Sequence, residues 1–242
     1  MRKIDIIYED KDIIVIRKPA GLATQSGKVG QADAVSQLKK HLAGQNAGKQ
    51  KELYLGVVHR LDQPVEGLLV FAKTKKAAAA LSNQLAEGSL NKRYYAVLCG
   101  QPSAESGELV DYLRKDKDNR AQVVTGQQDK YKDAKKAVLQ YRILETITVP
   151  ETISLAEIQI ETGRFHQIRV QMAHGGMELL GDKKYGGEHN AALSHRVGVC
   201  NVMLFAGQLA LRHPVTQKLM EFSIIPKNGA FSLFAEKCYT DN

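Results

Sequence analysis

One carboxylate of the sequence stands where it can do chemistry, in the polar turn His59-Arg60-Leu61-Asp62. The stretch from Val57 to Lys73 reads VVHRLDQPVEGLLVFAK, so one apolar run enters the turn and another leaves it. A carboxylate at the end of a strand can act as a nucleophile or as a base. Turns also favour aspartate for structural reasons, including ion pairs. The spacing alone makes Asp62 a candidate and leaves both interpretations open.

A second set of polar side chains lies in the segment GRFHQIRVQMAHGG, residues 163–176. Three of its side chains can bind a phosphate or a carboxylate: Arg164, His166 and Arg169. The segment is predicted to form a short helix after a strand, and the first N–H groups of a helix also attract anions. An amphipathic helix with solvated arginines accounts for the same pattern.

A third candidate is the basic and aromatic run Lys92-Arg93-Tyr94-Tyr95. A tyrosine beside basic residues can stack on a nucleic-acid base while the cations meet phosphates. The structural alternative is an exposed start of a strand.

Several other chemistries lack their motifs. The sequence has no G-x-G fingerprint for dinucleotides, no G-x-x-x-x-G-K-[ST] phosphate loop and no G-x-S-x-G nucleophile elbow. His166 and His174 are eight residues apart, which places them roughly 80° apart around a helix axis and two turns along it. They are poorly placed to share a metal ion.

The charge of the chain favours acidic partners such as nucleic acids. Among 242 residues, Lys and Arg number 34 and Asp and Glu number 26, which gives a net charge of +8. Apolar residues make up 43% and charged residues 25%, so the chain is of ordinary globular composition and not disordered. Since no apolar run is long enough for a membrane helix and the N-terminus carries acids, we expect a cytoplasmic protein.

Strand patterns outnumber helix patterns and do not alternate regularly with them, which predicts an α+β fold. Helices are predicted around residues 35–42, 75–87 and 166–174, and strands around 4–7, 13–16, 94–99, 138–144 and 154–160, with a hairpin over 209–225. Residues 111–136 are rich in charge, which is typical of a solvated hairpin or loop, or of an element that contacts RNA.

Five segments, in this order, resemble the motifs of the RluA-like family of RNA pseudouridine synthases. HRLDQPVEGLLVFAK at 59–73 is similar to the family signature HRLD-x-x-[TS]-[SG]-G-L-L-x-F-A-K. The other four are EDKDIIVIRKPAGLATQSG at 9–27, KRYYAVLCG at 92–100, GRFHQIRVQMAHGGMELLGDKKYG at 163–186 and LFAGQLALRHPVTQKLMEFSIIP at 204–226. One motif can arise by chance, but an ordered set over about residues 4–227 is specific.

The resemblance implies a fold and a reaction. The fold is α+β, a mixed and largely antiparallel curved sheet flanked by helices and loops, with a central cleft. The reaction detaches the uracil of a uridine in RNA, turns it within the site and rejoins it to the ribose through carbon 5. It includes no redox or phosphoryl-transfer step, so no cofactor and no metal are expected. The implied partner is ribosomal or transfer RNA, and we expect a monomer without a membrane or an obligate protein partner.

The resemblance also assigns roles to four residues. Asp62 matches the catalytic aspartate, and Arg169 matches the arginine that pairs with it and keeps it ionised. Tyr94 matches the tyrosine that stacks on the uracil, and Arg60 matches the arginine that enters the RNA stack as the target base leaves. Candidate phosphate contacts are Lys92, Arg93, Lys183 and Lys184.

The sequence departs from the family pattern at three places. Gln63-Pro64-Val65-Glu66 replaces residues whose hydroxyls help to shape the loop after the aspartate. Leu204-Phe205-Ala206 lacks the histidine of the closing L-H-A. Many relatives carry a small N-terminal RNA-binding module, whereas this sequence begins with strands of the catalytic domain. We therefore expect a single catalytic domain over residues 1–242.

Two other functions stay open. A protein that binds RNA without chemistry fits the changed loop at 63–66, and Asp62→Ala would then complement a deletion as well as the wild type does. A metal hydrolase that acts on acidic substrates would be inactivated by chelators, but the histidine spacing disfavours it.

Overall fold

The fold is taken from a computed structural model that describes residues 4–27, 30–45, 53–126, 131–148, 151–235 and 239. The chain forms two compact units. Unit 1 comprises Met1–Lys92 and Ala206–Ile224, and unit 2 comprises Arg93–Phe205 and Ile225–Asn242. Within the described residues, no helix is long and apolar enough to cross a membrane.

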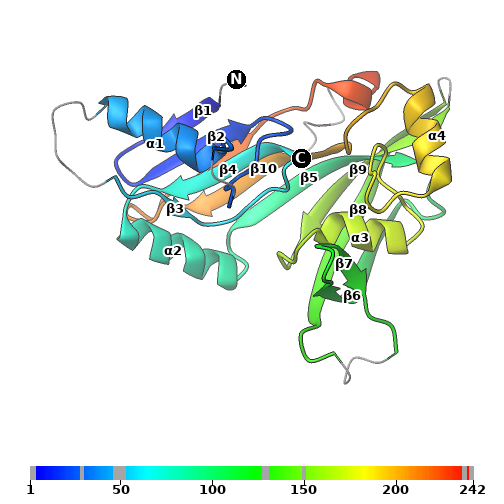
Figure 1. The fold of residues 1–242 in the computed structure, drawn as a ribbon, viewed down its shortest axis with the longest axis horizontal. Coiled ribbons are helices and arrows are strands. Elements are labelled where there is room, and N and C mark those ends of the chain that lie inside the picture. The colour runs from blue at the N-terminus through cyan, green and yellow to red at the C-terminus, as the bar shows by residue number, and fades with distance from the viewer. Residues whose placement is uncertain are drawn as a thin grey trace. The chain divides into compact units, whose positions relative to one another are not determined.

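Unit 1 is built on largely antiparallel strands with two helices. Its elements are β1 (Asp5–Glu9), β2 (Ile13–Lys18), α1 (Ala34–Gln45), β3 (Gly56–Val57), β4 (Glu66–Ala72), α2 (Lys75–Ala86), most of β10 (Leu204–Arg212) and β11 (Leu219–Ser223) (Figure 1). The strands lie in the order β1-β2-β4-β10, with β3 paired to β4 and β11 to β10. The pairs β1–β2, β2–β4, β3–β4 and β10–β11 are antiparallel.

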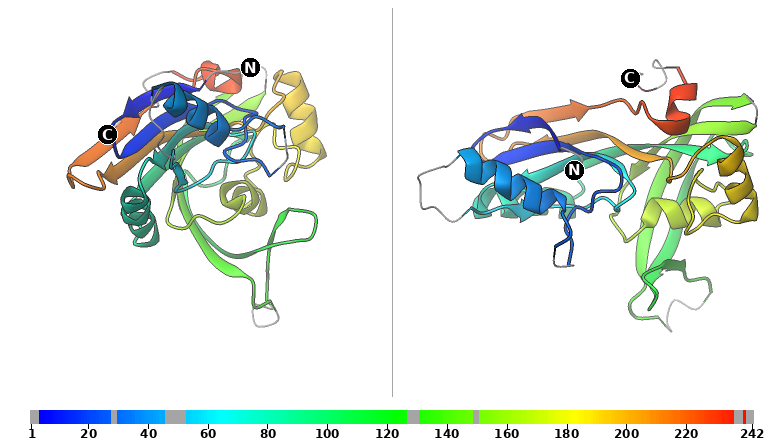
Figure 2. Two further views of the ribbon diagram at one scale, coloured as in Figure 1. Left: turned by 60° about the vertical axis from the view of Figure 1, so that its left-hand side comes forward. Right: turned by 45° about the horizontal axis from the view of Figure 1, so that its top comes forward.

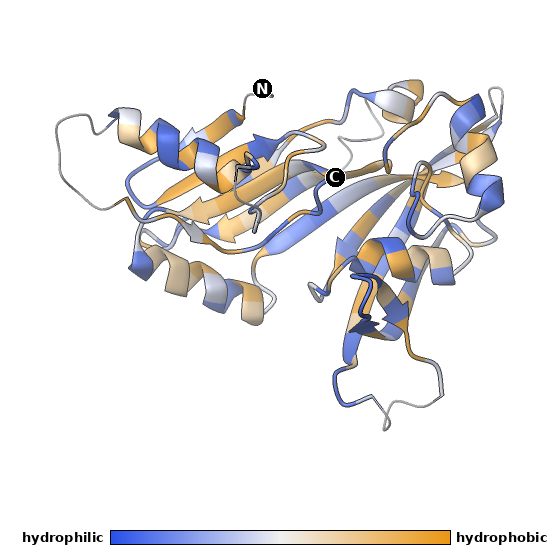
Figure 3. Ribbon diagram, viewed as in Figure 1, coloured by the Kyte–Doolittle hydropathy of each residue, from blue (hydrophilic) through white to orange (hydrophobic). Residues whose placement is uncertain are grey.

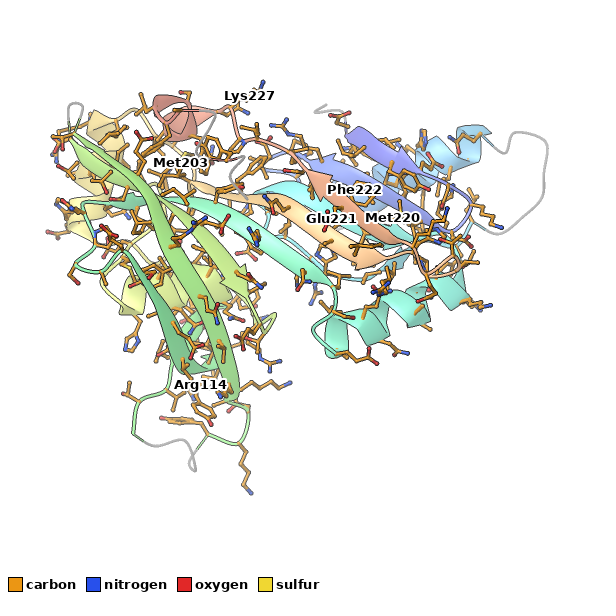
Figure 4. The ribbon with its side chains drawn as sticks, turned by 180° about the vertical axis from the view of Figure 1, so that it is seen from behind. Arg114, Met203, Met220, Glu221, Phe222 and Lys227 are labelled. Atoms are coloured by element: carbon orange, nitrogen blue, oxygen red, sulfur yellow. The ribbon has the colours of Figure 1, made fainter. Side chains whose placement is uncertain are left out.

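The core of unit 1 follows from its apolar strands. The sequences IIVI in β2 and LLVFA in β4 are buried along their whole length, so these strands are covered on both faces, and hydrophobic colour runs along β4 in Figure 3. Helix α2 begins where the Thr74 hydroxyl accepts the N–H of Ala77 at 3.1 Å, and it buries Ala77 and Leu81. In β11, Met220 and Phe222 pack against this core (Figure 4). The strand therefore has one apolar face.

Unit 2 is built on antiparallel strands with its own helices. Its elements are most of β5 (Asn91–Cys99), β6 (Ser106–Lys115), β7 (Ala121–Val123), β8 (Lys135–Thr148), β9 (Thr152–Ile160), α3 (Gln167–His174), α4 (Glu188–Arg196) and the 3₁₀ helix η2 (Gly229–Leu233). The strands lie in the order β5-β9-β8-β6-β7, and each neighbouring pair is antiparallel. Helix α3 packs on β6 and β7 (Figure 2), where Val170 joins Leu113, Ala121 and Ala137 in a small core.

The predicted α+β class with a largely antiparallel sheet is confirmed. The charged stretch 111–136 contains a hairpin, in which the end of β6 pairs with β7. The chain then continues to the start of β8, and residues 127–130, between β7 and β8, lie outside the described part. Two basic side chains of this stretch lie over aromatic rings: the guanidinium of Arg114 (Figure 4) is 4.1 Å from the ring centroid of Tyr131, and the ammonium of Lys115 is 4.8 Å from that of Phe165. Its contact with RNA stays a prediction. Helix α4 and the 3₁₀ helix were not predicted.

Candidate active site

Asp62 lies in unit 1, in the loop that joins β3 to β4. Its side chain is half-buried, and its carbonyl accepts the N–H of Val65 at 3.0 Å, which closes a tight turn. Arg60, two residues earlier, is exposed. The prediction of a polar turn between two strands is therefore confirmed, and the carboxylate that it carries is only partly covered by protein.

The loop begins at a buried histidine that stays neutral. The Nε2 of His59 accepts the N–H of Val70 in β4 at 3.3 Å. Burial, with a smaller contribution from the charge of Lys92, lowers the pKa of His59 to about 3. His59 therefore holds the start of the loop against β4, and its imidazole stays neutral near pH 7.

The residues on either side of Asp62 are held by the segment that follows β2. The Thr24 hydroxyl donates to the Leu61 carbonyl at 3.0 Å and accepts the Leu61 N–H at 3.2 Å. The Gly21 N–H donates to the Gln63 carbonyl at 2.8 Å, and the Gln63 side-chain amide donates to the Gly21 carbonyl at 3.1 Å. The backbone before and after Asp62 is thus fixed by two reciprocal pairs of hydrogen bonds.

A buried lysine completes this clamp. Lys18 is fully buried, and its Nζ donates to the carbonyls of Leu22 at 2.6 Å, Pro19 at 3.2 Å and Gln63 at 3.2 Å. Burial lowers the pKa of Lys18 to about 8, although the charges of Asp62 and Glu66 favour its ammonium form. Lys18 was not among the predicted site residues. The sequence signal for Lys18 was its place at the start of the K-P-A-G motif. Pro19 of that motif supplies one of the backbone carbonyls that a buried ammonium needs.

In unit 2, Arg169 is held by a second aspartate. Its Nε and Nη2 donate to the two oxygens of Asp182, each at 2.7 Å, and both side chains are buried. The guanidinium also lies 5.1 Å from the ring centroid of Tyr185. The predicted pairing of Arg169 with Asp62 joins residues of different units and stays a prediction. Asp182 was not predicted as a site residue, although it stands in the G-D-x-x-Y-G part of the fourth motif.

Asp182 is a carboxylate whose contacts are all structural. It accepts two hydrogen bonds from Arg169 and the backbone N–H groups of Lys184 at 2.9 Å and Tyr185 at 3.2 Å. Burial raises the pKa of Asp182, but the hydrogen bonds and charge of Arg169 outweigh it and hold this pKa below its usual value. The side chain therefore stays ionised and orients the guanidinium.

His166 precedes α3 and adopts a left-handed backbone with φ of 52°. Its Nδ1 lies 2.7 Å from the hydroxyl of Tyr185, which also accepts the N–H of Ala121 at 2.8 Å. The exposed ring of Phe165 stacks on the imidazole with 3.8 Å between centroids. His166 therefore links the start of α3 to β7, which differs from its predicted place within a helix.

Tyr94 and Lys92 are buried, which differs from the alternative of an exposed strand start. Tyr94 is 6% exposed and Lys92 is 8% exposed, and burial lowers the pKa of Lys92 to about 8. Arg93 pairs with Glu157 at 3.4 Å, and the Nζ of Lys184 donates to the carbonyl of Asn119. The exposed-start alternative is therefore wrong, and among the four candidate phosphate contacts Lys183 is the exposed one.

One group of side chains in unit 1 has the composition of a metal site. Asp10, Asp12 and His213 each place a possible ligand atom within 4.8 Å of the others. The Nδ1 of His213 accepts backbone N–H groups, at 3.3 Å from Val215 and 3.0 Å from Thr216, so the ring proton lies on Nε2 and points to Asp10 at 2.8 Å. Both ring nitrogens of His213 are therefore engaged in hydrogen bonds within the protein.

Comparison with known proteins gives consistent matches along the chain. A family model described as RNA pseudouridylate synthase matches residues 12–174. Ribosomal large subunit pseudouridine synthase D of Zymomonas mobilis is 36% identical over 223 residues, which span 90% of this chain and 68% of the relative. tRNA pseudouridine synthase C of Haemophilus ducreyi is 31% identical, over 92% of this chain and 91% of the relative. The solved structure titled human RNA pseudouridylate synthase domain containing 4 is similar with a TM-score of 0.71 and 26% identity, over 91% of this chain and 87% of that chain.

Proposed function

Since the chain belongs to the RNA pseudouridylate synthase family and is an isomerase of that class, we propose that it converts specific uridines of ribosomal or transfer RNA to pseudouridine through the carboxylate of Asp62. The observation that carries this proposal is the clamp around the Asp62 loop. Residues 61 and 63, on either side of Asp62, are held by the segment after β2, while the aspartate itself is only half-buried. Such an arrangement presents a carboxylate in a defined position, which is what chemistry at a sugar carbon requires.

The reaction breaks the bond between N1 of uracil and C1′ of the ribose, and forms a bond between C5 and C1′. Positive character develops at the sugar while the uracil leaves as an anion. A nearby carboxylate can attack or stabilise such a sugar, as in glycoside chemistry, or it can promote loss of a sugar proton. After the new bond forms, C5 loses its proton and N1 gains one, so the product is an isomer of the substrate.

Three further residues receive roles in this proposal. Arg60 is exposed beside the Asp62 loop, which suits a side chain that enters the RNA stack. The target base must leave the helix to react, at a cost of a few kcal/mol. Tyr94 would stack on the uracil, a contact worth about 1–3 kcal/mol per base. Arg169, oriented by Asp182, would pair with Asp62.

We propose that both units form one catalytic domain, because the matched family model covers parts of each. Phosphate attraction by the net charge of +8 would bring RNA to it, with a strong dependence on salt. We further propose that the enzyme works as a monomer in the cytoplasm without an obligate protein partner.

The test uses RNA from cells that lack the gene, labelled with tritium at carbon 5 of uridine. The purified protein is expected to release tritium, and the pseudouridines that disappear with the gene identify the target. Absence of release from both ribosomal and transfer RNA would contradict the proposal. If Asp62→Ala complements the deletion as well as the wild type does, the protein acts by binding RNA without chemistry.

A further inference from the structure

The loop that carries Asp62 ends at an ion pair in a place where the family signature has no charge. Position 66 is Ser or Gly in that signature, and here it is Glu66, the first residue of β4. The Glu66 Oε1 accepts from the Nε of Arg17 at 2.7 Å and from its Nη2 at 2.5 Å. One carboxylate oxygen thus receives two charged donors of the same guanidinium.

The ion pair bridges the two central strands of unit 1 at the edge of the loop. In the antiparallel register of β2 and β4, Arg17 lies opposite Leu68 and Lys18 lies opposite Gly67. Glu66 is two residues from Leu68, so it shares a face of the sheet with Arg17 in a diagonal position. The side chains of Arg17 and Glu66 are 26% and 16% exposed, which protects the pair partly from solvent.

This contact secures the far end of the loop. The near end is held by Thr24 at Leu61, and the centre by Gly21 and Lys18 at Gln63. Residue 67 then enters the sheet with φ of 137°, and a Cβ there would lie 2.4 Å from the Ala206 carbonyl oxygen, so only glycine fits. Residue 66 is therefore the last position at which a side chain can anchor the loop before the sheet begins.

The pair also sets the charge balance beside Lys18. The charges of both Asp62 and Glu66 act on Lys18. Arg17 compensates Glu66, so the ammonium of Lys18 is left to balance Asp62. Loss of Arg17 would leave two carboxylates around one buried ammonium, which shifts the loop and the clamp together.

We propose that the ion pair of Arg17 and Glu66 positions Asp62 for the reaction, in place of the hydroxyl-bearing residues that the family signature has after the aspartate. Both are positioning residues, because they act through the backbone of the loop. The inference rests on the proposed function. It differs from the ordinary expectation for a partly exposed ion pair, which contributes little to stability and nothing to turnover.

The experiment compares Arg17→Met, Glu66→Gln and the double variant in steady-state tritium release. Each single variant is expected to lower kcat about tenfold, since small displacements of a reacting group are costly. KM for RNA is expected to stay within about twofold, because the pair acts on position and not on RNA affinity. The double variant is expected to be no slower than the worse single variant, because both changes remove the same contact.

The matched control is Arg196→Gln, which breaks the partly exposed ion pair of Arg196 and Glu151 in unit 2 and should leave kcat unchanged. Unchanged kcat in Arg17→Met and Glu66→Gln would overturn the inference. So would additive losses, or a rise in KM in Arg17→Met alone, which would indicate direct contact of Arg17 with RNA.

Amide hydrogen exchange separates this inference from the proposed function. In Glu66→Gln, the amides of residues 61–63 and 65–67 are expected to exchange faster than in the wild type, while Arg196→Gln leaves them unchanged. If the wild type releases no tritium but the variant still shows this change, the proposed function is wrong and the ion pair still anchors the loop. If exchange at 61–67 is unaltered, the anchoring is wrong whatever the activity.

Discussion

Two of the aspartates in the family motifs, Asp62 and Asp182, have opposite surroundings. Asp62 in unit 1 is half-buried, and the contacts that fix its loop are made at Leu61 and Gln63. Asp182 in unit 2 is buried, and its own oxygens accept four hydrogen bonds. The Asp62 loop is thus held through its neighbouring residues, whereas the Asp182 carboxylate is itself saturated by donors, supports the fold and orients Arg169.

The strongest way to break this comparison is to remove the Asp62 carboxylate. Asp62→Ala is expected to lower kcat by about 10⁴-fold or more, as removal of a group that reacts with substrate does. The melting temperature and the RNA affinity are expected to stay close to those of the wild type, because its neighbours hold the loop. Tritium release, thermal unfolding and filter binding measure the three quantities. A large loss of stability would make Asp62 structural after all.

The converse change in unit 2 should act on stability. Asp182→Ala leaves the buried guanidinium of Arg169 without its carboxylate, which is expected to cost about 3–5 kcal/mol in the free energy of unfolding. Urea denaturation measures this loss, and Asp118→Ala, at an exposed position of the same unit, is the control. A variant as stable as the control would contradict a structural role.

Acid pH tests the structural role of Asp182 in a second way. Because the pKa of Asp182 is held below its ordinary 3.8, its contribution to stability is present above that pH and is lost as the pH falls through the lower folded value. Below about pH 4, loss of the Asp182 contribution is thus expected to lower the free energy of unfolding of the wild type. The stability difference between wild type and Asp182→Ala should shrink there. A difference that stays constant with pH would argue against the ionised pair.

Lys18→Met tests the clamp of the Asp62 loop. The change removes the donor to three carbonyls, and kcat is expected to fall about 10–100-fold because the aspartate loses its fixed position. The control is Lys76→Met, at an exposed position in α2. Wild-type turnover in Lys18→Met would show that the clamp has no part in positioning.

Alkaline pH tests the role of Lys18 through both stability and activity. The pKa of Lys18 is lowered from 10.5 to about 8, so the folded protein releases this proton before the unfolded chain does. The Lys18 contribution to the free energy of unfolding therefore rises between pH 8 and 10.5, while activity falls as the ammonium is lost. Rate and stability should move in opposite directions in the wild type. Lys18→Met should lack the fall in rate and show a smaller rise in stability, because Lys92, whose pKa burial also lowers to about 8, still contributes to that rise. A parallel decline would contradict this assignment.

The smallest expected effect is that of Tyr185→Phe. It removes the hydroxyl that accepts the Ala121 N–H and contacts His166, at an expected cost of about 1 kcal/mol in stability. Turnover is expected to change little, because the lost contact ties β7 to the start of α3. Denaturant unfolding measures the stability loss, and tritium release on the same preparation measures the turnover. A turnover loss like that of Lys18→Met would place the hydroxyl in the chemistry.

Local signals predicted the elements that depend on local contacts. Helix α2 was expected over 75–87 and runs over Lys75–Ala86, because its cap and apolar spacing lie within one segment. Helix α4 was missed since EHNAALSHR has no clear apolar stripe, and its buried face includes Asn190 and Ser194, which bond to each other and to unit 2 backbone. Strand β8 proved longer than predicted, because its outer residues pair with β6 and β9.

The sequence by itself determined the family, the reaction and the identity of Asp62 as the candidate carboxylate, because motif order and residue type are written along the chain. Only the tertiary structure decided how that residue is held. Lys18 and Gln63 are 45 residues apart, and Arg17 and Glu66 are 49 apart. Contacts over such separations depend on the pairing of β2 with β4, and burial then determines which charges are neutralised and which face solvent.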